Sequence, residues 1–467
     1  MVPSKPNSGP EPAPTAFPGL ALLGPEACTQ ALPYPALIRA LGEGFAAGAV
    51  ASAVRVIHGP EMPSVMALAE AAGASLACQH HQRGTGDAVR AALPLPEGTE
   101  RVLVLSGDVP LLEAPALEAF LAAVPANAVG VMTTSLADPT GFGRMLRDDA
   151  GAVVGIVEEK DATEAQRALQ EINAGVYCFP AGPLPRWLDA LTADNAQGEL
   201  YLTDLIALAR ADGVPCLAQH EADADSLRGA NTRAQLADLE ATLQHRRRAA
   251  VMAAGVTLRA PETVVIRGSL EAGQDCIIDV GCVFEGKVIL GENVKVGAHC
   301  VIKDAELRDG AQVAPLTHIE GALVGPEAQL GPFARLREGT VLGRGARIGN
   351  FVETKKATLG DYSKANHLAY LGDATLGERV NVGAGTITCN YDGIGKHPTV
   401  LGNDVFVGSN STLVAPLTVG DGAFLGAGST ITKDVDAETL AVGRGRQRSI
   451  AGWQSPKARA HQIKDEG

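Results

Sequence analysis

Aliphatic residues recur at every sixth position through much of the C-terminal half of the chain. One series consists of Leu401, Val407, Leu413, Val419, Leu425 and Ile431, and another of Val324, Leu330, Leu336, Leu342 and Ile348. Mostly small residues follow the second series four positions later, at Ala328, Ala334, Thr340, Ala346 and Val352. A period of six matches neither an amphipathic α-helix nor an alternating strand. It predicts a parallel β-helix, in which three hexads form one triangular coil with the aliphatic side chains stacked inside.

The first half of the chain has a different pattern. Short apolar runs such as Arg101–Ser106 alternate with helix-like stretches such as residues 111–124, which indicates βα units on a mostly parallel sheet. Residues 232–250 contain three spaced leucines and no Gly or Pro, so they predict a long connecting helix. We interpret the arginines at its end, Arg246, Arg247 and Arg248, as a solvated helix terminus.

These patterns divide the chain into five predicted segments. Residues 1–18 carry six prolines and are expected to be a disordered leader. An α/β domain over 19–231, a linker helix over 232–250, a β-helix over 251–445 and a C-terminal tail over 446–467 follow. The composition agrees with two differently built halves, because 32 of the 54 glycines fall in residues 251–467.

Charge and cysteine content exclude several classes of function. The net charge is −14 with no long basic run, which argues against nucleic acid and membrane surfaces as partners and favours small-molecule substrates. The eight cysteines are scattered without C-x-x-C pairs or histidines at zinc-ligand spacing, as expected for reduced thiols in the cytoplasm. Neither a membrane span nor a signal peptide is predicted.

One interruption of the repeats is a candidate functional loop. Residues 388–400, TCNYDGIGKHPTV, break the six-residue register, which resumes intact at Leu401. Insertions in a solenoid usually lie on a binding face. Just upstream, FVETKKA at 351–357 and HLAYLGD at 367–373 place Glu353, Lys355, His367 and Tyr370 within one or two coils of each other. A histidine is the ordinary general base near neutral pH, so this cluster suits the deprotonation of an amine.

With these motifs, residues 331–453 resemble the acetyltransferase half of a known family of bifunctional enzymes. Its members are the N-acetylglucosamine-1-phosphate uridyltransferase / glucosamine-1-phosphate N-acetyltransferases of bacterial cell-wall precursor synthesis. The resemblance implies a left-handed β-helix, a homotrimer and His367 as the general base. It further implies sugar-phosphate binding by Arg337, Lys355, Tyr370 and Asn381. The residues that it implies for acetyl-CoA binding are Ala384, Asn390, Tyr391, Ser409, Ala427 and Arg444.

The resemblance extends over the chain from about residue 70. It rests there on QRGTGDA at 82–88, SGDVP at 106–110, DPTGFGR at 138–144, VEEKD at 157–161, EINAG at 171–175 and NAQGELYLTD at 195–204. It implies a Rossmann-like sugar nucleotidyltransferase domain that uses UTP and binds Mg²⁺ through Asp108 and Asn231, whose oxygens suit that ion. By this resemblance, uracil would contact Gln79, Gly84 and Thr85, and the sugar would contact Gly143, Glu158 and Asn173. Gly107 and Asn231 complete the implied nucleotide-sugar site.

One segment departs from the family pattern. The family begins this domain with a Gly-x-Gly-Thr-Arg-Met loop and a nearby lysine, whereas residues 20–35 here read LALLGPEACTQALPYP, and no Arg or Lys occurs between Lys5 and Arg39. Charge neutralisation of the phosphates is central to nucleotidyl transfer. Three hypotheses therefore stand. The first is a bifunctional enzyme whose phosphate contacts are weakened or supplied from elsewhere, and the second is an acetyltransferase whose N-terminal domain is a non-catalytic structural or sugar-nucleotide-binding module. The third is a non-catalytic hexapeptide scaffold.

Overall fold

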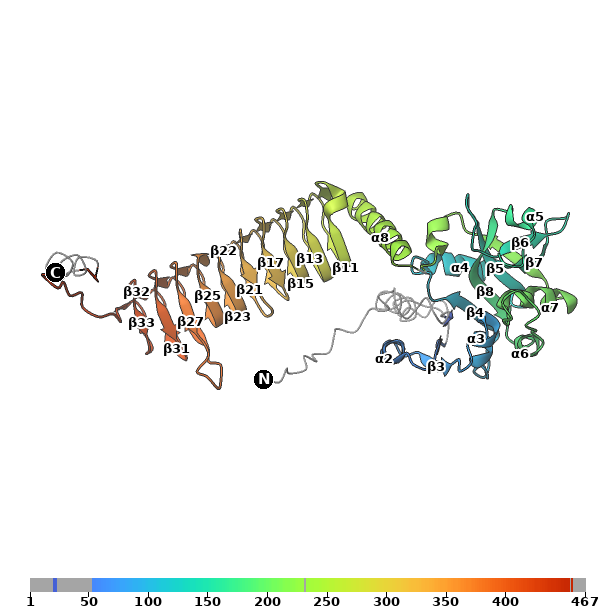
Figure 1. Cartoon of the computed structure of the whole chain (residues 1–467). Coiled ribbons are helices and arrows are strands. Elements are labelled where there is room, and N and C mark those ends of the chain that lie inside the picture. Colours follow the sequence, from blue (N-terminus) through green and yellow to red (C-terminus); the bar gives the residue numbers. More distant parts are fainter. Residues whose placement is uncertain (1–19, 23–52, 231, 454, 457–467) are drawn as a thin grey trace, which may run out of the picture. The chain divides into compact units, whose positions relative to one another are not determined.

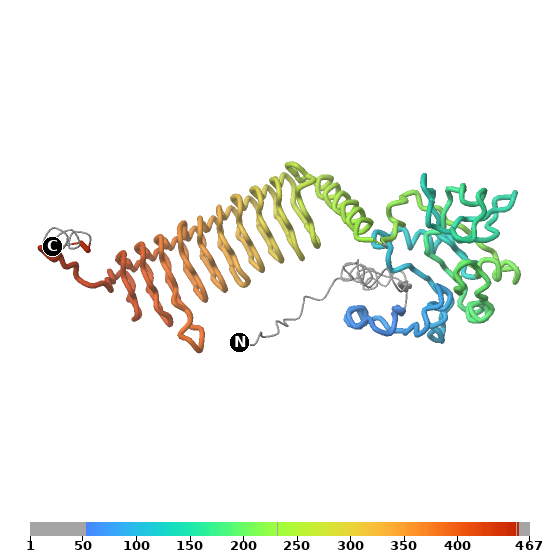
Figure 2. Tube along the Cα trace, in the orientation of Figure 1, coloured from blue at the N-terminus to red at the C-terminus, as the bar shows by residue number. Residues whose placement is uncertain are grey.

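The computed structural model describes residues 20–22, 53–230, 232–453 and 455–456. The predicted leader, nearly all of the segment that departs from the family pattern, Asn231 and the end of the C-terminal tail lie outside these residues. The chain folds into two compact units, Met1–Leu243 and Gln244–Gly467, and each is described by itself (Figures 1 and 2).

The first unit is an α/β domain. Its strands are β1 (Leu20–Leu22), β2 (Arg55–His58), β3 (Ser75–Cys78), β4 (Arg101–Ser106), β5 (Val129–Ser135), β6 (Arg144–Arg147), β7 (Val153–Val157), β8 (Glu171–Pro180) and β9 (Cys216–His220). Its α-helices are α2 (Pro63–Ala71), α3 (Thr85–Ala91), α4 (Ala114–Ala123), α5 (Glu164–Arg167), α6 (Leu184–Asp189) and α7 (Leu205–Ala211), with short 3₁₀ helices at Leu202–Asp204 and Ala224–Leu227. The predicted strand at Arg101–Ser106 is confirmed, and the helix predicted over 111–124 spans Ala114–Ala123.

The strands form one sheet in the order β3-β2-β1-β4-β8-β5-β9, with the β6–β7 hairpin beside β8. Strands β3, β2, β1 and β4 are parallel, and β9 is parallel to β5. Strand β8 runs antiparallel to both β4 and β5, so the sheet is mixed, although most of its pairs along the main path are parallel as predicted. From β1 the chain adds β2 and β3 on one side of the sheet, and it then adds β4 on the other side of β1. A ligand crevice is expected at such a switch, outside the carboxyl ends of the strands.

The second unit confirms the β-helix. Helix α8 (Arg233–Ala253) precedes a 3₁₀ helix at Pro261–Thr263 and two long parallel ladders. One ladder contains β10 (Thr257–Leu258), β12 (Ile277–Ile278), β14 (Lys295–Val296), β16 (Gln312–Val313), β19 (Gln329–Leu330), β22 (Arg347–Asn350), β24 (Lys364–His367), β26 (Asn381–Val382), β29 (Phe406–Val407), β32 (Phe424–Leu425) and β34 (Leu440–Ala441). The other contains β11 (Val265–Ala272), β13 (Val283–Leu290), β15 (Val301–Leu307), β17 (His318–Glu320), β18 (Leu323–Val324), β20 (Arg335–Leu336), β21 (Val341–Leu342), β23 (Glu353–Leu359), β25 (Tyr370–Leu376), β27 (Ile387–Cys389), β28 (Thr399–Leu401), β30 (Thr412–Val414), β31 (Leu417–Val419) and β33 (Thr430–Ile431).

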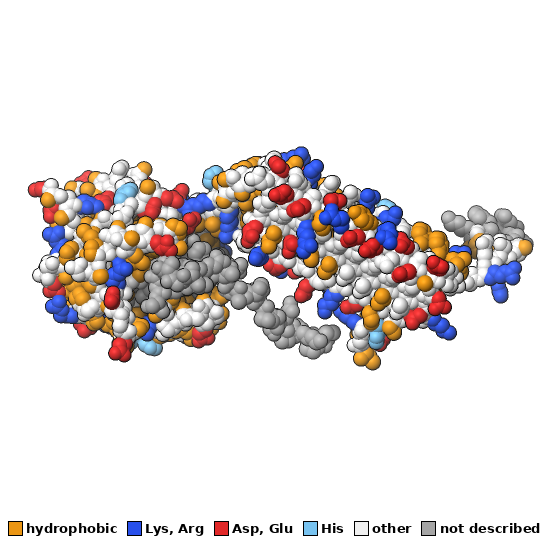
Figure 3. Space-filling view, turned by 180° about the vertical axis from the view of Figure 1, so that it is seen from behind, with side chains coloured by type: hydrophobic (Ala, Val, Ile, Leu, Met, Phe, Trp, Pro, Cys, Tyr) orange, Lys and Arg blue, Asp and Glu red, His pale blue; other side chains and the backbone are white. Residues whose placement is uncertain are grey.

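The period-six residues form the core of these coils. Both aliphatic series and the residues four positions after the second series are buried, as the hexad pattern predicts. Acidic and basic side chains are interspersed over the outside of the coils on the face drawn in Figure 3. In the described part of the chain no helix combines the length and apolar character needed to cross a membrane.

The interpretation of the arginine triplet as a solvated helix terminus is wrong. Helix α8 continues to Ala253, beyond the predicted end at 250. Gln244 exchanges two hydrogen bonds with the backbone of Ile266, each 2.8 Å long, and the Arg247 guanidinium donates to the same carbonyl at 2.6 Å. Arg248 donates to the Val264 carbonyl at 3.2 Å. These side chains satisfy backbone groups of the first coil that have no preceding coil to pair with.

Candidate active sites

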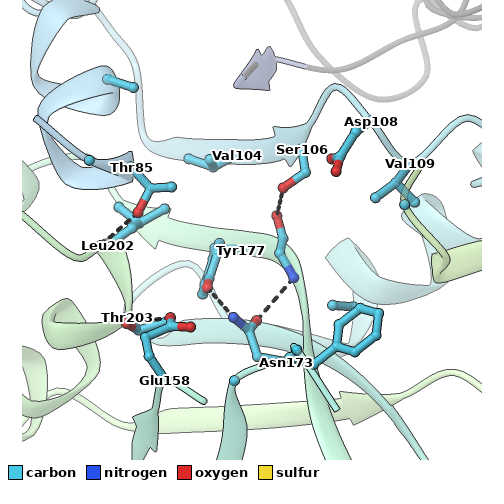
Figure 4. Close-up of a pocket in the computed structure, with 18 of the residues that line it drawn as sticks. Thr85, Val104, Ser106, Asp108, Val109, Glu158, Asn173, Tyr177, Leu202 and Thr203 are labelled. Carbon is cyan, nitrogen blue, oxygen red and sulfur yellow. Dashed lines mark hydrogen bonds between the residues drawn. The ribbon is translucent and has the colours of Figure 1, made fainter. Parts of the chain in front are cut away.

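A cavity of about 460 Å³ opens at the carboxyl ends of the first domain's strands, where the topology predicts a ligand crevice (Figure 4). It gathers residues that are far apart in the sequence but that the resemblance assigns to one nucleotide-sugar site. These lining residues are Gln79, Gly84, Thr85, Asp108, Gly143, Glu158 and Asn173. Gly107 is not among the lining residues, and Asn231 lies outside the described residues. The binding roles of these residues stay predictions.

The start of α3 forms one wall of the cavity. The Gln79 amide donates to the Gly84 carbonyl at 3.0 Å and to the Asp87 carboxylate at 3.1 Å, which fixes the loop before the helix. Gly84 has a φ of +102°, and an added Cβ would lie 2.7 Å from the Leu200 carbonyl oxygen, so only glycine fits there. The Thr85 hydroxyl accepts a hydrogen bond from the Leu202 amide at 3.0 Å.

The opposite wall contains a half-buried carboxyl group. Burial, followed by the nearby charges of Asp204, Asp161 and Glu199, raises the pKa of Glu158, although a hydrogen bond of 3.1 Å from the Thr203 hydroxyl opposes this shift. The Asn173 amide donates to the Tyr177 hydroxyl, and its oxygen accepts from the Gly175 amide at 3.0 Å (Figure 4). These bonds orient polar groups toward a ligand of the size and polarity of a sugar.

Asp108 has the features expected of a cation ligand. Its side chain lies at the end of β4, where burial raises the pKa of the carboxyl group. An added Cβ on Gly229 would lie 2.8 Å from Asp108 Oδ2, so this glycine leaves the carboxylate room. Within the described ranges no ion pair involves Asp108, and no cluster of three or more metal-ligating side chains is found. A hard cation such as Mg²⁺ fits a half-buried carboxylate that has no protein counter-charge among the described residues.

The β-helix places its candidate site along one column of residues. His367 ends β24, and the strand registers and turn hydrogen bonds place Ala384, Ser409 and Ala427 at equivalent positions of the following coils. Asn381 lies three residues before Ala384, on β26. Gly383 and Gly408 directly precede Ala384 and Ser409 of this column. Each position requires glycine, because an added Cβ would lie within 2.6 Å of the backbone of the next coil. Arg444, whose guanidinium donates to the Ala427 carbonyl at 2.6 Å, marks its far end.

Asn350 orients the candidate base. It lies opposite His367 on the neighbouring strand β22, and its side-chain oxygen is 2.8 Å from His367 Nδ1. Because an amide oxygen only accepts hydrogen bonds, Nδ1 carries a proton, and in the neutral ring Nε2 then has a free lone pair. His367 is exposed on the single chain, so a substrate can reach Nε2.

Three cations form a cluster on the face of the coils next to the one that carries His367. Arg337 and Lys355 occupy equivalent positions of successive coils, two residues after the paired Arg335 and Glu353. The pKa of Lys355 is lowered, first by the charge of Lys396 and then by that of Arg337, so the three cations lie close together. Glu353 accepts a hydrogen bond from Arg337 at 2.8 Å. Such a group of cations suits a phosphate.

The interrupting loop lies beside these cations. Tyr370 begins β25, and an added Cβ on Gly372 would lie 2.5 Å from the Tyr370 hydroxyl and 2.8 Å from Asn390 Nδ2. Asn390 is buried and donates to Asp373, whereas Tyr391 is exposed. The structure therefore brings the side chains of Tyr370 and Asn390 together beside Gly372, whereas the Tyr391 hydroxyl donates to the Gly393 carbonyl within the loop.

Sequence reasoning missed Lys396, Asn350, Tyr177 and Thr203. Lys396 lies in the interrupting loop. Its positive charge, so near the positively charged Lys355 in the coil order, was a signal that could have placed it in the same phosphate site. Thr203 lies in a quoted motif, at 195–204, and that motif could have pointed to its contact with Glu158. The partnership of Asn350 with His367 depends on a coil register that the sequence pattern alone does not assign.

Comparisons with known proteins agree with this architecture. Residues 37–175 match the MobA-like NTP transferase domain, residues 266–358 the GMPPB C-terminal domain, and residues 398–433 the bacterial transferase hexapeptide family. A nucleotidyltransferase domain followed by a hexapeptide β-helix defines a class of two-domain transferases.

Curated relatives identify the family within that class. The bifunctional protein GlmU of Stutzerimonas stutzeri is 55% identical over 378 residues, which cover 81% of this chain and 83% of the relative. The GlmU protein of Marinobacter nauticus is 49% identical over 407 residues, with coverage of 87% and 90%. The chain belongs to the GlmU family. Among solved structures, the Francisella novicida UDP-N-acetylglucosamine acyltransferase covers 40% of this chain and 67% of its own at 16% identity and a TM-score of 0.30, a similarity too weak to add to this assignment.

Proposed function

We propose that the chain transfers the acetyl group of acetyl-CoA to glucosamine-1-phosphate at the β-helix site, and that its N-terminal domain binds the UDP-N-acetylglucosamine of the following uridyl-transfer step. The observation that carries this proposal is the set of groups near His367. The small residues Ala384, Ser409 and Ala427 follow it at equivalent positions of the next coils, and the cations Arg337, Lys355 and Lys396 lie close together. Membership of the GlmU family supports a bifunctional enzyme over a non-catalytic scaffold.

The acetyl transfer needs one base and no covalent enzyme intermediate. Nε2 of His367 accepts a proton from the neutral amine of the sugar as the amine attacks the thioester, and this proton can then pass to the CoA thiolate. The amine nitrogen forms a bond with the acetyl carbonyl carbon, the carbon–sulfur bond breaks, and CoA leaves as a thiolate. The sugar phosphate is held by Arg337, Lys355 and Lys396. Acetyl-CoA is held by the column of Ala384, Ser409 and Ala427. The test is direct detection of N-acetylglucosamine-1-phosphate by mass spectrometry.

The N-terminal domain contributes the nucleotide-sugar site. Gln79, Gly84 and Thr85 lie on the wall assigned to uracil, and Gly143, Glu158 and Asn173 lie on the wall assigned to the sugar. Asp108 and Asn231 would hold Mg²⁺, which supplies neutralisation of phosphate charge when bound. UTP is the co-substrate of this step, and the enzyme acts in the cytoplasm.

Substitution of Asp108 is expected to remove the effect of Mg²⁺ on nucleotide-sugar binding. In the wild type, Mg²⁺ should tighten UDP-N-acetylglucosamine binding in calorimetry, and Asp108→Asn should weaken that effect by at least about tenfold. Glu164→Gln, at an exposed position of α5, is the matched control. Burial raises the pKa of Asp108, so this carboxyl group is protonated at a higher pH than an ordinary aspartate. The effect of Mg²⁺ on nucleotide-sugar binding should therefore be lost at a higher pH during acidification than for an ordinary carboxylate ligand. Equal Mg²⁺ effects in wild type and Asp108→Asn would contradict this assignment.

A column of exposed apolar side chains supports a trimer. Leu316, Phe333, Phe351 and Leu368 occupy one corner of successive coils, each with a positive φ and an exposed fraction between 47% and 60%. Phe333 and Phe351 stack with ring centroids 5.4 Å apart. The column ends next to His367, so a second copy that covers it would also border the acetyl-transfer site.

Phe351→Glu is therefore expected to convert the trimer to monomers and to lower acetyl transfer together with it. Tyr362→Glu is the matched control, because Tyr362 has the same kind of backbone conformation and a similar exposure, 55%, on another corner. Sedimentation and CoA release are measured for both variants. A fully active monomer would overturn the proposal that subunits share this site.

A further inference from the structure

The loop that interrupts the repeats is a small β-hairpin over residues 390–397, and it projects beyond the ends of the neighbouring coils (Figures 1 and 2). The His397 amide donates to the Asn390 carbonyl at 2.8 Å, Tyr391 and Lys396 form an antiparallel bridge, and the Asp392 amide donates to the Gly395 carbonyl at 3.2 Å. The hairpin is short and exposed, so its own backbone bonds hold it weakly.

Side-chain alternation gives the hairpin two different faces. Paired residues share a face and the next pair lies on the opposite one, so Tyr391 and Lys396 lie on one face and Asp392 and His397 on the other. The first face carries Lys396, a residue of the proposed substrate site, whose charge is the main cause of the lowered pKa of Lys355. At the base, Asn390 lies over Gly372, whose neighbour in strand register is Lys355.

The second face carries a hydrogen bond between two side chains that closes the hairpin. His397 Nε2 lies 2.7 Å from Asp392 Oδ2, and Asp392 Oδ1 accepts from the Ile394 and Gly395 amides at 2.8 and 2.7 Å. One carboxylate thus joins the tip of the hairpin to the strand that carries Lys396. The hydrogen bond to the Gly395 amide, the His397 ring and the Ile394 amide lower the pKa of Asp392, which keeps this group an acceptor.

We propose that Asp392 and His397 are positioning residues that hold the hairpin so that Lys396 faces the phosphate of the amino sugar. This inference rests on the proposed acetyl transfer. Neither residue touches the reacting atoms, so loss of the pair should weaken capture of the sugar phosphate and leave the chemical step at His367 intact.

The expected result is a split between the two kinetic constants. His397→Ala should raise the KM for glucosamine-1-phosphate by up to about fivefold, the range of a single hydrogen bond, with kcat unchanged within about twofold. His397→Gln, which keeps a donor, should restore most of the wild-type KM, and His397→Phe should not. Ile394→Ala is the control for the hairpin, because Ile394 is 96% exposed at its tip and should leave both constants unchanged.

A double-mutant cycle separates positioning of Lys396 from a general loss of structure. In a Lys396→Ala background, His397→Ala should cause no further rise in the KM for glucosamine-1-phosphate. The same KM increase in both backgrounds, or a wild-type KM in His397→Ala, would overturn the proposal. Absence of acetyl transfer by the wild-type chain would instead contradict the proposed function, so the two failures are distinguishable.

Discussion

His367→Ala is expected to lower the kcat of acetyl transfer by about 10²- to 10⁴-fold, with little change in the KM for either substrate. The imidazole acts mainly in the transition state, because it removes the amine proton as the nitrogen attacks the thioester. The hydrogen bond between Nδ1 and Asn350 presents Nε2 as the base. Free CoA release at saturating substrate concentrations measures the change.

His245→Ala is the matched control, since His245 is also exposed but lies on helix α8, before the first coil of the β-helix. It should retain the wild-type kcat. A His367→Ala enzyme as fast as the wild type would remove His367 from the mechanism. Asn350→Ala should lower kcat by a smaller factor than His367→Ala, because it leaves the imidazole in place without its fixed orientation.

Uridyl transfer from UTP is expected to be at least about 10²-fold slower than the family's phosphate-binding motif would allow, a difference of about 2.7 kcal/mol in activation free energy. The reason is the absence of Arg and Lys between Lys5 and Arg39, where the family has both. Binding of UDP-N-acetylglucosamine should suffer less, because the residues assigned to uracil and sugar line the described cavity.

A chimera tests this charge argument. It replaces residues 21–34 with a Gly-x-Gly-Thr-Arg-Met…Leu-Pro-Lys segment, and pyrophosphate release is followed with Mg²⁺, UTP and N-acetylglucosamine-1-phosphate. The chimera should be faster by the factor stated above, and its acetyl transfer should be unchanged. Equal rates of pyrophosphate release in the two proteins would show that this segment does not supply the phosphate chemistry.

The β-helix was predictable because its repeat encodes the burial of each coil directly. Leu330 and Ala334, for example, recur with the hexad and are both buried. The sheet of the first domain was predictable only as a class. An apolar run such as β8 predicts a buried strand but carries no information on its direction, which long-range pairing with β4 and β5 decides.

The candidate sites were predictable where motifs carry the information. The residues at Gln79, Glu158 and Asn173 were named from the resemblance, and the topology brings them to one cavity. Partners that depend on three-dimensional register were not predictable. Helix α8 illustrates this limit, because the charges of Arg247 and Arg248 suggest exposure to water, whereas their guanidinium groups bind carbonyls of the first coil.

The most direct test of a bifunctional enzyme with intact acetyl transfer and impaired uridyl transfer is one reaction in which both products are measured. The wild-type chain is supplied with glucosamine-1-phosphate, acetyl-CoA, UTP and Mg²⁺, and free CoA and pyrophosphate are followed together. We predict rapid release of CoA that requires the amino sugar, with pyrophosphate release at least about 10²-fold slower. Pyrophosphate release that keeps pace with CoA release, or no sugar-dependent release of CoA, would contradict the account.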